Sequence, residues 1–236
     1  MNLILLHPED HPHSGPRVRL MGRRLTHALD VHRASVGDEL AVGLLNGKIG
    51  TGKVIRIDEA VLEMDVLLDR EPPKPLPLTV ILALPRPKVM RRALYSLTVM
   101  GVKRIILFNT ARVGKSYWQT PFLEEAAVRK QLLLGLEQAK DTMLPEILLR
   151  KRFKPFVEDE LPALIKEATP LVAHPGAVGV CPVSMKGRVV LAVGPEGGFV
   201  PYEVEKLTSL GFVPVNLGER ILNIETALPA LIGRLF

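Results

Sequence analysis

A glycine-rich turn that carries one acid follows an apolar run near the end of the chain. The run Leu191–Val193 leads directly into the turn Gly194–Gly198. Glycine reaches positive φ without steric cost, so such a turn bends sharply and lets another group approach its backbone. Pro201 and Gly211 then predict the start and the end of a helix. The spacing therefore predicts a strand-to-helix turn at which a ligand can bind.

A second turn of the same kind follows the strand predicted at Phe212–Asn216. It runs over Leu217–Leu222 and enters the last helix, which we expect to begin near Glu225 with Pro229 in its first turn. One glycine-rich turn alone is more often a tight connection than a site. Two in succession, at the carboxyl ends of neighbouring strands, lie where open α/β sheets bind ligands. The pairing therefore favours a binding crevice.

The residues of these turns resemble the closing signature of a known family. GPEGGF at 194–199 and LGERILNIETA at 217–227 are similar to the GPEGG and LGxRILRxETA motifs of SPOUT-class RNA methyltransferases, specifically of the RsmE family. That family methylates N3 of a uridine in bacterial 16S ribosomal RNA. The resemblance extends over nearly the whole chain. It implies S-adenosyl-L-methionine as methyl donor, 16S rRNA of the small ribosomal subunit as partner, a homodimer, and a trefoil knot within residues 189–236.

We expect the methyl donor in a crevice made by residues 171–176, 194–198 and 217–222. Glycine turns leave backbone groups open to an adenine edge and a ribose, and leucine and isoleucine side chains give apolar cover. The chain has neither a glycine-rich Rossmann fingerprint nor a Walker lysine, which argues against a dinucleotide or ATP. The residues expected at the donor are Leu171, Val172, His174, Gly194, Pro195, Glu196, Gly197, Gly198, Leu217, Gly218, Ile221, Leu222, Thr226 and Ala227.

Charged residues of the same turns are the catalytic candidates. Methylation of uridine N3 requires loss of the N3 proton, and a cation beside the developing oxyanion stabilises its charge. Arg220 is the candidate for that role or for holding an RNA phosphate, and a salt bridge to Glu196 or Glu225 is the structural alternative. The proton acceptor is Glu196, Glu225 or water; a carboxylate accepts it only if burial raises its pKa.

Histidine and cysteine usage points to no further chemistry. His174 ends a predicted strand, where a histidine is more often a hydrogen-bonded structural residue than a general base. No second histidine or cysteine stands at ligand spacing, so we expect no metal. The single cysteine, Cys181, excludes an internal disulfide framework and fits a reducing compartment. With no visible signal peptide and no long apolar segment, we expect a cytoplasmic protein without a membrane partner.

The 236-residue chain carries a formal net charge of +6 at pH 7, which favours a polyanionic partner. Its basic residues form two groups, and contact with nucleic acid is therefore favoured over the alternative of two solvated faces. The RNA-binding candidates are Arg17, Arg19, Arg23, Arg24 and Arg33 in the first group and Arg150, Lys151 and Arg152 in the second.

A run of prolines divides the chain. The four prolines within residues 72–77 predict a stiff connector between an N-terminal module, residues 1–71, and a second domain, residues 78–236. In the module, strands are predicted at 39–45, 52–57 and 61–68, with Asn46-Gly47 as a hairpin turn. The resemblance implies that this module is a PUA-like RNA-binding β-barrel.

Strands alternate with helices after the connector, which predicts a mainly parallel sheet. Predicted strands at 78–84 and 104–108 flank a helix at 87–100, and another helix is expected to begin at Thr120-Pro121. The expected fold class is therefore α/β: a small PUA-like β-barrel followed by an α/β SPOUT domain with a trefoil knot.

Some positions depart from the family pattern. Ser96 and Val99 stand where the family usually has a lysine and a glutamate, Ala139–Asp141 where it has a serine and an arginine, and Asn223 where an arginine is common. These positions could touch RNA, so the target nucleotide stays open, as does the choice between naked rRNA and an assembled subunit. The alternatives are a methyltransferase for a different rRNA nucleotide and an RNA-binding protein of the same architecture without catalysis. A phosphate-binding α/β enzyme is less favoured, because no lysine or serine accompanies the turn.

Overall fold

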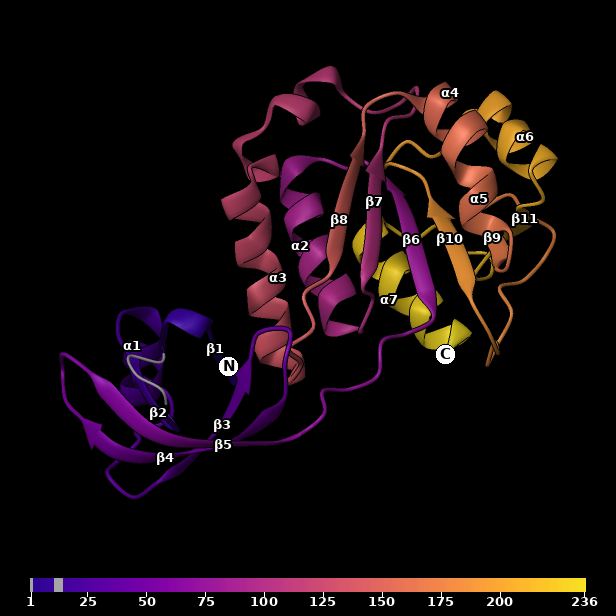
Figure 1. The fold of residues 1–236 in the computed structure, drawn as a ribbon. Helices are drawn as coiled ribbons and strands as arrows, with labels where there is room; N and C mark the ends of the chain where they lie inside the picture. The colour runs from indigo at the N-terminus through magenta and orange to yellow at the C-terminus, as the bar shows by residue number, and fades with distance from the viewer. Residues whose placement is uncertain (1, 11–14) are drawn as a thin grey trace. The chain divides into compact units, whose positions relative to one another are not determined.

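The computed structural model describes residues 2–10 and 15–236, and the chain folds into two compact units. Unit 1 comprises Met1–Lys74 and Leu133–Leu144, and unit 2 comprises Pro75–Leu132 and Pro145–Phe236. Each unit is built on its own sheet (Figure 1). The sequence alone placed residues 133–144 in the second domain, whereas their contacts group them with unit 1.

Unit 1 is a curled five-stranded sheet in the order β1-β3-β4-β5-β2 (Figure 1). β1 runs parallel to β3, and the other neighbours are antiparallel. Alternate residues of the strands enter a core that includes Val18, Leu20, Val42, Leu62 and Met64. The elements are β1 (Ile4–Leu6), a 3₁₀ turn (Pro8–Asp10), β2 (Arg17–Leu20), α1 (Arg23–Asp30), β3 (Glu39–Leu44), β4 (Ile49–Ile57) and β5 (Leu62–Arg70).

The hairpin between β3 and β4 turns at Asn46 and Gly47, as predicted. Asn46 has a φ of 59°, and the N–H of Gly47 donates to the carbonyl of Leu44 at 2.8 Å. At Gly50 an added Cβ would lie 1.8 Å from the carbonyl oxygen of Leu67. Only glycine therefore lets β4 and β5 approach this closely, at a register shift that bends the strand.

The end of α3 (Glu125–Ala139) is bound to the start of the chain within unit 1. The N–H groups of Asn2 and Leu3 both donate to the carbonyl of Glu137 at 3.0 Å. The carboxylate of Glu137, 3% exposed, pairs with Arg23 at 2.5 Å. These contacts join residues more than a hundred positions apart, so no local pattern predicts them.

Unit 2 is a six-stranded sheet in the order β11-β9-β10-β6-β7-β8, with all neighbours parallel, which confirms the predicted parallel α/β sheet. β10 is buried at every position, as expected of a strand covered on both faces. The strands are β6 (Leu78–Ala83), β7 (Arg104–Phe108), β8 (Glu146–Arg150), β9 (Thr169–Ala173), β10 (Val189–Val193) and β11 (Val213–Val215). The helices are α2 (Pro87–Val99), α4 (Phe153–Pro155), a π turn (Phe156–Glu160), α5 (Leu161–Ile165), α6 (Pro201–Ser209) and α7 (Ile224–Leu235).

The helix predicted to begin at Pro121 begins four residues later. Thr120 does accept a hydrogen bond from the N–H of Phe122, at 3.4 Å. It caps only a 3₁₀ turn, however, because Glu124 is extended with a ψ of 141° and interrupts the helical path before α3. A second 3₁₀ turn, Lys115–Gln119, precedes it.

The last helix begins next to Glu225, as predicted, and only the place of Pro229 differs from the prediction. α7 starts at Ile224, and the side-chain oxygen of Asn223 accepts a hydrogen bond from the N–H of Thr226 at 2.8 Å. Pro229, which was expected in the first turn, lies inside α7. Asn223, a departure from the family pattern, thus serves here as the helix cap. Among the residues that the structure describes, no helix is long and apolar enough to cross a bilayer.

Candidate active site

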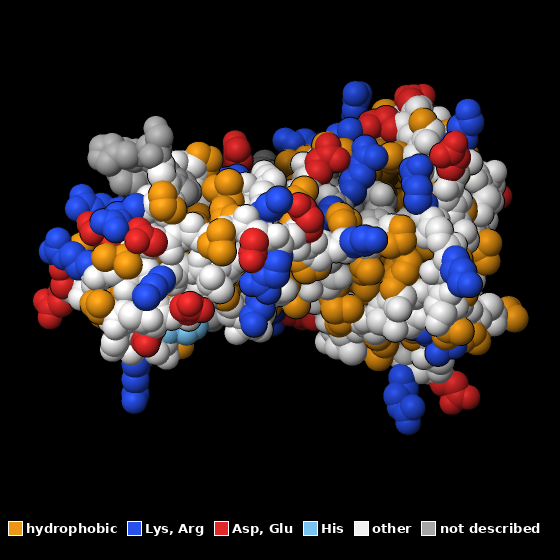
Figure 2. All heavy atoms as spheres, turned by 60° about the horizontal axis from the view of Figure 1, so that its bottom comes forward, with side chains coloured by type: hydrophobic (Ala, Val, Ile, Leu, Met, Phe, Trp, Pro, Cys, Tyr) orange, Lys and Arg blue, Asp and Glu red, His pale blue; other side chains and the backbone are white. Residues whose placement is uncertain are grey.

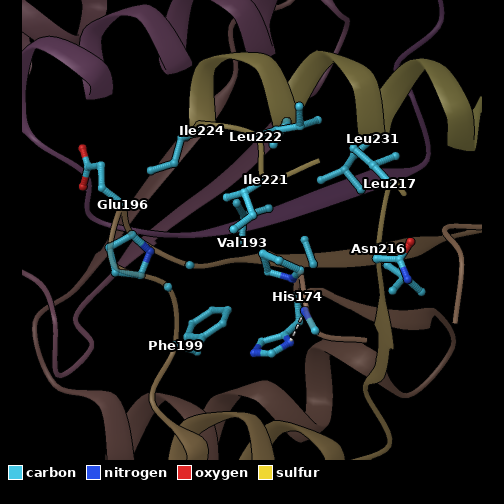
Figure 3. A pocket seen from close by; sticks show the side chains of 18 of the residues that line it. His174, Val193, Glu196, Phe199, Asn216, Leu217, Ile221, Leu222, Ile224 and Leu231 are labelled. Atoms are coloured by element: carbon cyan, nitrogen blue, oxygen red, sulfur yellow. Dashed lines mark hydrogen bonds between the residues drawn. The ribbon is translucent and has the colours of Figure 1, made fainter. Parts of the chain in front are cut away.

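A cavity of about 440 Å³ opens at the carboxyl ends of β9, β10 and β11. Both turns predicted from the sequence line it, together with the segment after β9 and with α7 (Figure 3). The structure thus brings together most of the expected donor and catalytic residues: His174, Gly194, Pro195, Glu196, Gly197, Gly198, Leu217, Gly218, Arg220, Ile221, Leu222 and Ala227.

Some expected donor residues lie outside the cavity. Leu171 and Val172 belong to the body of β9 and are buried in the core, at 3% and 0% exposure, because only the carboxyl end of the strand reaches the opening. Thr226 is exposed in the first turn of α7. Other residues line the cavity without having been expected there: Arg112, Val193, Phe199, Val215, Asn216, Ile224 and Leu231. Val193 and Phe199 flank the glycine turn and were predictable from it, but Arg112 was not.

The first turn takes its shape from its glycines. An added Cβ at Gly194 would lie 3.1 Å from the backbone nitrogen of Phe199 and 3.3 Å from Gly198. Gly198 has a φ of 70°, and its N–H donates to the carbonyl of Pro195 at 2.7 Å. A side chain at either glycine is disfavoured, by crowding at Gly194 and by positive φ at Gly198. The turn therefore leaves this wall of the cavity as nearly bare backbone.

Asn216 holds the second turn against the segment that follows β9. Its N–H donates to the carbonyl of Gly179, and its carbonyl accepts from the N–H of Cys181, each at 2.8 Å. Its side-chain nitrogen donates to the carbonyl of Ala177 at 2.6 Å, and its side-chain oxygen accepts from the N–H of Gly218 at 2.8 Å. Gly218 takes a φ of 106°, which favours glycine. One asparagine thus joins the second turn to the segment that follows β9.

Apolar side chains surround the middle of the cavity. Figure 3 shows Ile224 and Leu231 on the side of α7, His174 and Phe199 on the opposite side, and Ile221 between them. Ile221 is 83% exposed although it lines the cavity. Covering such a side chain with an apolar group is favourable, so the cavity suits a ligand with an apolar part.

The carboxylates of Glu196 and Glu225 both bind α2. Glu196 accepts the backbone N–H of Arg86 at 2.9 Å, and in Figure 3 its carboxylate points away from the apolar centre. Glu225 pairs with Arg92 at 2.8 Å and does not line the cavity. The salt bridge considered between Arg220 and one of these acids is therefore not formed.

Two arginines line the cavity. Arg220 is exposed, and its guanidinium has no hydrogen bond or ion pair with the described part of the chain. Arg112 comes from the loop after β7, and its guanidinium donates to the carbonyl of Gly197 in the first turn. A second permanent positive charge therefore lies at the glycine turn, contributed by a segment 85 residues away.

The histidine and the cysteine near the site have structural partners. The Nδ1 atom of His174 accepts the N–H of Gly176 at 3.1 Å (Figure 3), which fits a structural role. Cys181 is 1% exposed, and burial raises the pKa of its thiol, so the neutral thiol is a poor nucleophile. Within residues 2–10 and 15–236, no group of three or more His, Cys, Asp or Glu side chains could hold a metal ion.

Most of the basic RNA-binding candidates form ion pairs. The pairs are Arg17–Asp65, Arg19–Glu63, Arg23–Glu137, Arg24–Asp10 and Arg150–Glu160. Arg33, Lys151 and Arg152 are exposed, with no ion pair to the described residues. Figure 2 shows Lys and Arg side chains mixed with Asp and Glu on the face drawn. The charge available to a polyanion is thus smaller than the two basic groups suggested.

A parallel α/β sheet with a cavity between two glycine turns at its carboxyl edge defines a protein that binds a small, partly apolar ligand. Residues 72–235 match the family described as RNA methyltransferase domain. This match covers more than half of the chain and every residue that lines the cavity. The chain belongs to the RNA methyltransferase domain family, and the resemblance to the RsmE family inferred from the two closing motifs is confirmed.

Individual relatives extend the similarity to both units. The ribosomal RNA small subunit methyltransferase E of Treponema pallidum is 25% identical over 232 residues, 96% of this chain and 87% of the relative. The protein of the same name from Mycobacterium bovis is 26% identical over 99% of this chain and 91% of its own. The crystal structure of the Neisseria gonorrhoeae enzyme bound to S-adenosyl methionine matches with a TM-score of 0.74 and 24% identity, covering 98% of this chain and 95% of that chain.

Proposed function

We propose that this protein transfers the methyl group of S-adenosyl-L-methionine to N3 of a uridine in the 16S ribosomal RNA of the small subunit. The observation that carries the proposal is the cavity formed jointly by residues 194–198 and 217–222, which hold the family motifs. The relatives named ribosomal RNA small subunit methyltransferase E support the substrate, and the solved relative bound to S-adenosyl methionine supports the donor.

The cavity residues fit this donor. When bound, the donor supplies an electrophilic methyl group on a sulfonium centre. A volume of about 440 Å³ lies within the range of small-molecule sites. Leu217, Ile221 and Leu222 offer apolar cover for the adenine ring, and the bare backbone of Gly194–Gly198 lets a ribose approach closely.

Arg220 acts on the acceptor base. Its guanidinium stabilises the negative charge that develops on the uracil as N3 loses its proton, or it holds the phosphate beside that base. The carboxylate of Glu196, one candidate proton acceptor, points away from the apolar centre of the cavity, and Glu225, the other candidate, does not line the cavity. We therefore favour water as the acceptor, with in-line positioning of the methyl group and N3 supplying most of the rate.

Unit 1 serves as a PUA-like RNA-binding barrel, a role supported by its curled sheet.

Basic residues of both units bind the RNA. Arg33 in unit 1 and Lys151 and Arg152 in unit 2 contact phosphates directly, because no carboxylate of the described residues competes for them. The other five arginine candidates must exchange a carboxylate for a phosphate, which lowers the free energy that they contribute to RNA binding. They are Arg17, Arg19, Arg23, Arg24 and Arg150. Ribosomal RNA as substrate implies a cytoplasmic location.

We also propose the trefoil knot within residues 189–236 and the homodimer. In support of the knot, the segment between β9 and β10 binds the end of the chain: the N–H groups of Ser184 and Met185 donate to the carbonyls of Arg234 and Leu235 at 3.2 and 2.6 Å. Asn216, just after β11, binds the same segment. Such bonds are expected where the closing helix runs past an earlier loop.

Mass mapping of 16S rRNA from cells with and without this protein tests the proposal. One uridine should lose its N3 methyl group without the protein and regain it when purified protein and donor are added, either to naked rRNA or to small subunits. Calorimetry should show donor binding to the isolated protein. If the protein does not bind the donor at millimolar concentration, the proposed donor site is wrong. RNA binding without methylation supports the non-catalytic alternative. Methylation at another position means that the target is a different nucleotide.

A further inference from the structure

A cluster of partly exposed aromatic residues lies between β7 and α3, outside the site described above. Tyr117, Trp118 and Phe122 belong to the two 3₁₀ turns Lys115–Gln119 and Pro121–Leu123, in which no residue is buried. Aromatic residues make up only 5% of the chain, and Trp118 is its single tryptophan. Each of the three buries most of its area and keeps a part exposed, so three aromatic side chains within six positions reach the surface together.

Two of these rings, those of Tyr117 and Trp118, are held in place at the carboxyl ends of the strands of the six-stranded sheet, and the cavity opens at the carboxyl ends of other strands of the same sheet. The indole N–H of Trp118 donates to the side-chain oxygen of Asn109 at 2.9 Å. Asn109 directly follows β7, and its own N–H donates to the carbonyl of Arg150 at the end of β8, also at 2.9 Å. An added Cβ at Gly114 would lie 2.9 Å from the ring of Tyr117, so that ring lies against the backbone. Figure 1 shows these turns beyond the carboxyl ends of β7 and β8.

Positive charge accompanies the rings. The guanidinium of Arg91 lies 4.8 Å from the centroid of Phe122. Lys115 is exposed at the start of the first turn. In the same loop, Arg112 lines the cavity and binds Gly197. The rings and the cavity are therefore joined by a single short segment, residues 112–122.

We propose that residues 115–122 form a stacking surface for unpaired bases of the substrate RNA, next to the cavity in which the methyl group is transferred. Proteins recognise single-stranded RNA by stacking its bases on aromatic side chains and pairing its phosphates with nearby cations. Both components are present here on a fixed support. The inference rests on the proposed function, because it assigns the surface that presents RNA to that site.

Trp118 allows a direct test, since a single tryptophan reports on this surface alone. The full chain is titrated with a uridine-rich single-stranded RNA and with duplex RNA of equal length, while tryptophan fluorescence and the anisotropy of labelled RNA are followed. The expected result is saturable quenching of Trp118 fluorescence that is stronger with the single strand than with the duplex. Anisotropy that shows RNA binding without any change in Trp118 fluorescence overturns the inference, as does an absence of RNA binding.

Substitutions locate the surface. Tyr117→Ala and Lys115→Ala should each weaken RNA binding about tenfold, the factor that corresponds to 1.4 kcal/mol, whereas Tyr117→Phe should retain binding because the ring remains. Tyr202→Ala, at a 47% exposed tyrosine of α6, and Lys186→Ala, at an exposed lysine, are the matched controls. Equal affinities for Tyr117→Ala and Tyr202→Ala contradict the inference. Calorimetry with the donor is run on every variant. If the donor binds but Trp118 does not respond to RNA, the stacking surface alone is rejected. If the unmodified chain does not bind the donor, the proposed function is rejected instead.

Discussion

At the residue scale, the carboxylate of Glu196 binds the backbone N–H of Arg86, which is the N-cap residue of α2. This bond ties the glycine turn to the start of a helix. Glu225 forms a comparable link through Arg92, on the second turn of the same helix. Arg220 has no such link among the described residues. Of the charged residues expected to act in catalysis, it is therefore the one whose charge is available to a substrate.

Arg220→Ala should lower the rate of methylation more than tenfold while calorimetry shows unchanged donor affinity, because the guanidinium acts on the acceptor base or its phosphate. Arg188→Ala, at an exposed arginine paired with Glu167, is the control. A rate within tenfold of the unmodified protein, less than about 1.4 kcal/mol of transition-state stabilisation, removes Arg220 from catalysis.

At the scale of elements, α6 connects the glycine turn with the loop that carries Arg112. Glu203 lies in the first turn of α6 and is 2% exposed. One of its carboxylate oxygens accepts the N–H of Ala111 at 2.7 Å, and the other accepts the N–H of Val200 at 2.9 Å. A single buried carboxylate thus sets the spacing of the two segments that place Arg112 at the cavity.

Glu203→Gln should reduce the free energy of unfolding of unit 2 by about 1–3 kcal/mol, because an amide group replaces one acceptor of this buried side chain and leaves the N–H of Ala111 or Val200 without its partner. Urea unfolding followed by Trp118 fluorescence measures this change. Glu205→Gln, at an exposed glutamate of the same helix, should leave stability within about 0.5 kcal/mol of the unmodified protein. Equal stability of the two variants means that the bonds of Glu203 contribute nothing.

At the scale of the whole molecule, unit 2 exposes apolar side chains on the segment between β9 and β10. Val178, Val180 and Val183 are 99%, 57% and 61% exposed. The same segment binds the turn after β11 and the end of α7. A subunit interface would cover such side chains, so they support the proposed homodimer.

Light scattering at micromolar protein concentration should give about twice the mass of one chain. Val178→Lys with Val180→Lys should shift the protein toward the monomer, because a lysine in an apolar interface leaves its charge unpaired. Lys166→Ala, at an exposed lysine, is the control. A monomeric mass for the unmodified protein contradicts the homodimer.

The sequence by itself determined the features that depend on neighbouring residues. The buried run Val189–Val193 and the glycine turn after it were predictable, because a central strand must be apolar and only glycine closes such a turn. The Asn46-Gly47 hairpin followed from local turn geometry in the same way. The two closing motifs were enough to indicate the family and the position of the cavity.

Only the tertiary structure decided which distant groups meet. Arg112 reaches the cavity from the loop after β7, and Glu196 binds a backbone N–H 110 positions away. The end of α3 joins unit 1 through the carbonyl and carboxylate of Glu137. Local periodicity contains none of this, because each contact depends on how the strands are ordered in the sheets. The guanidinium of Arg220, which has no partner among the described residues, and the bound carboxylates of Glu196 and Glu225 follow from that packing.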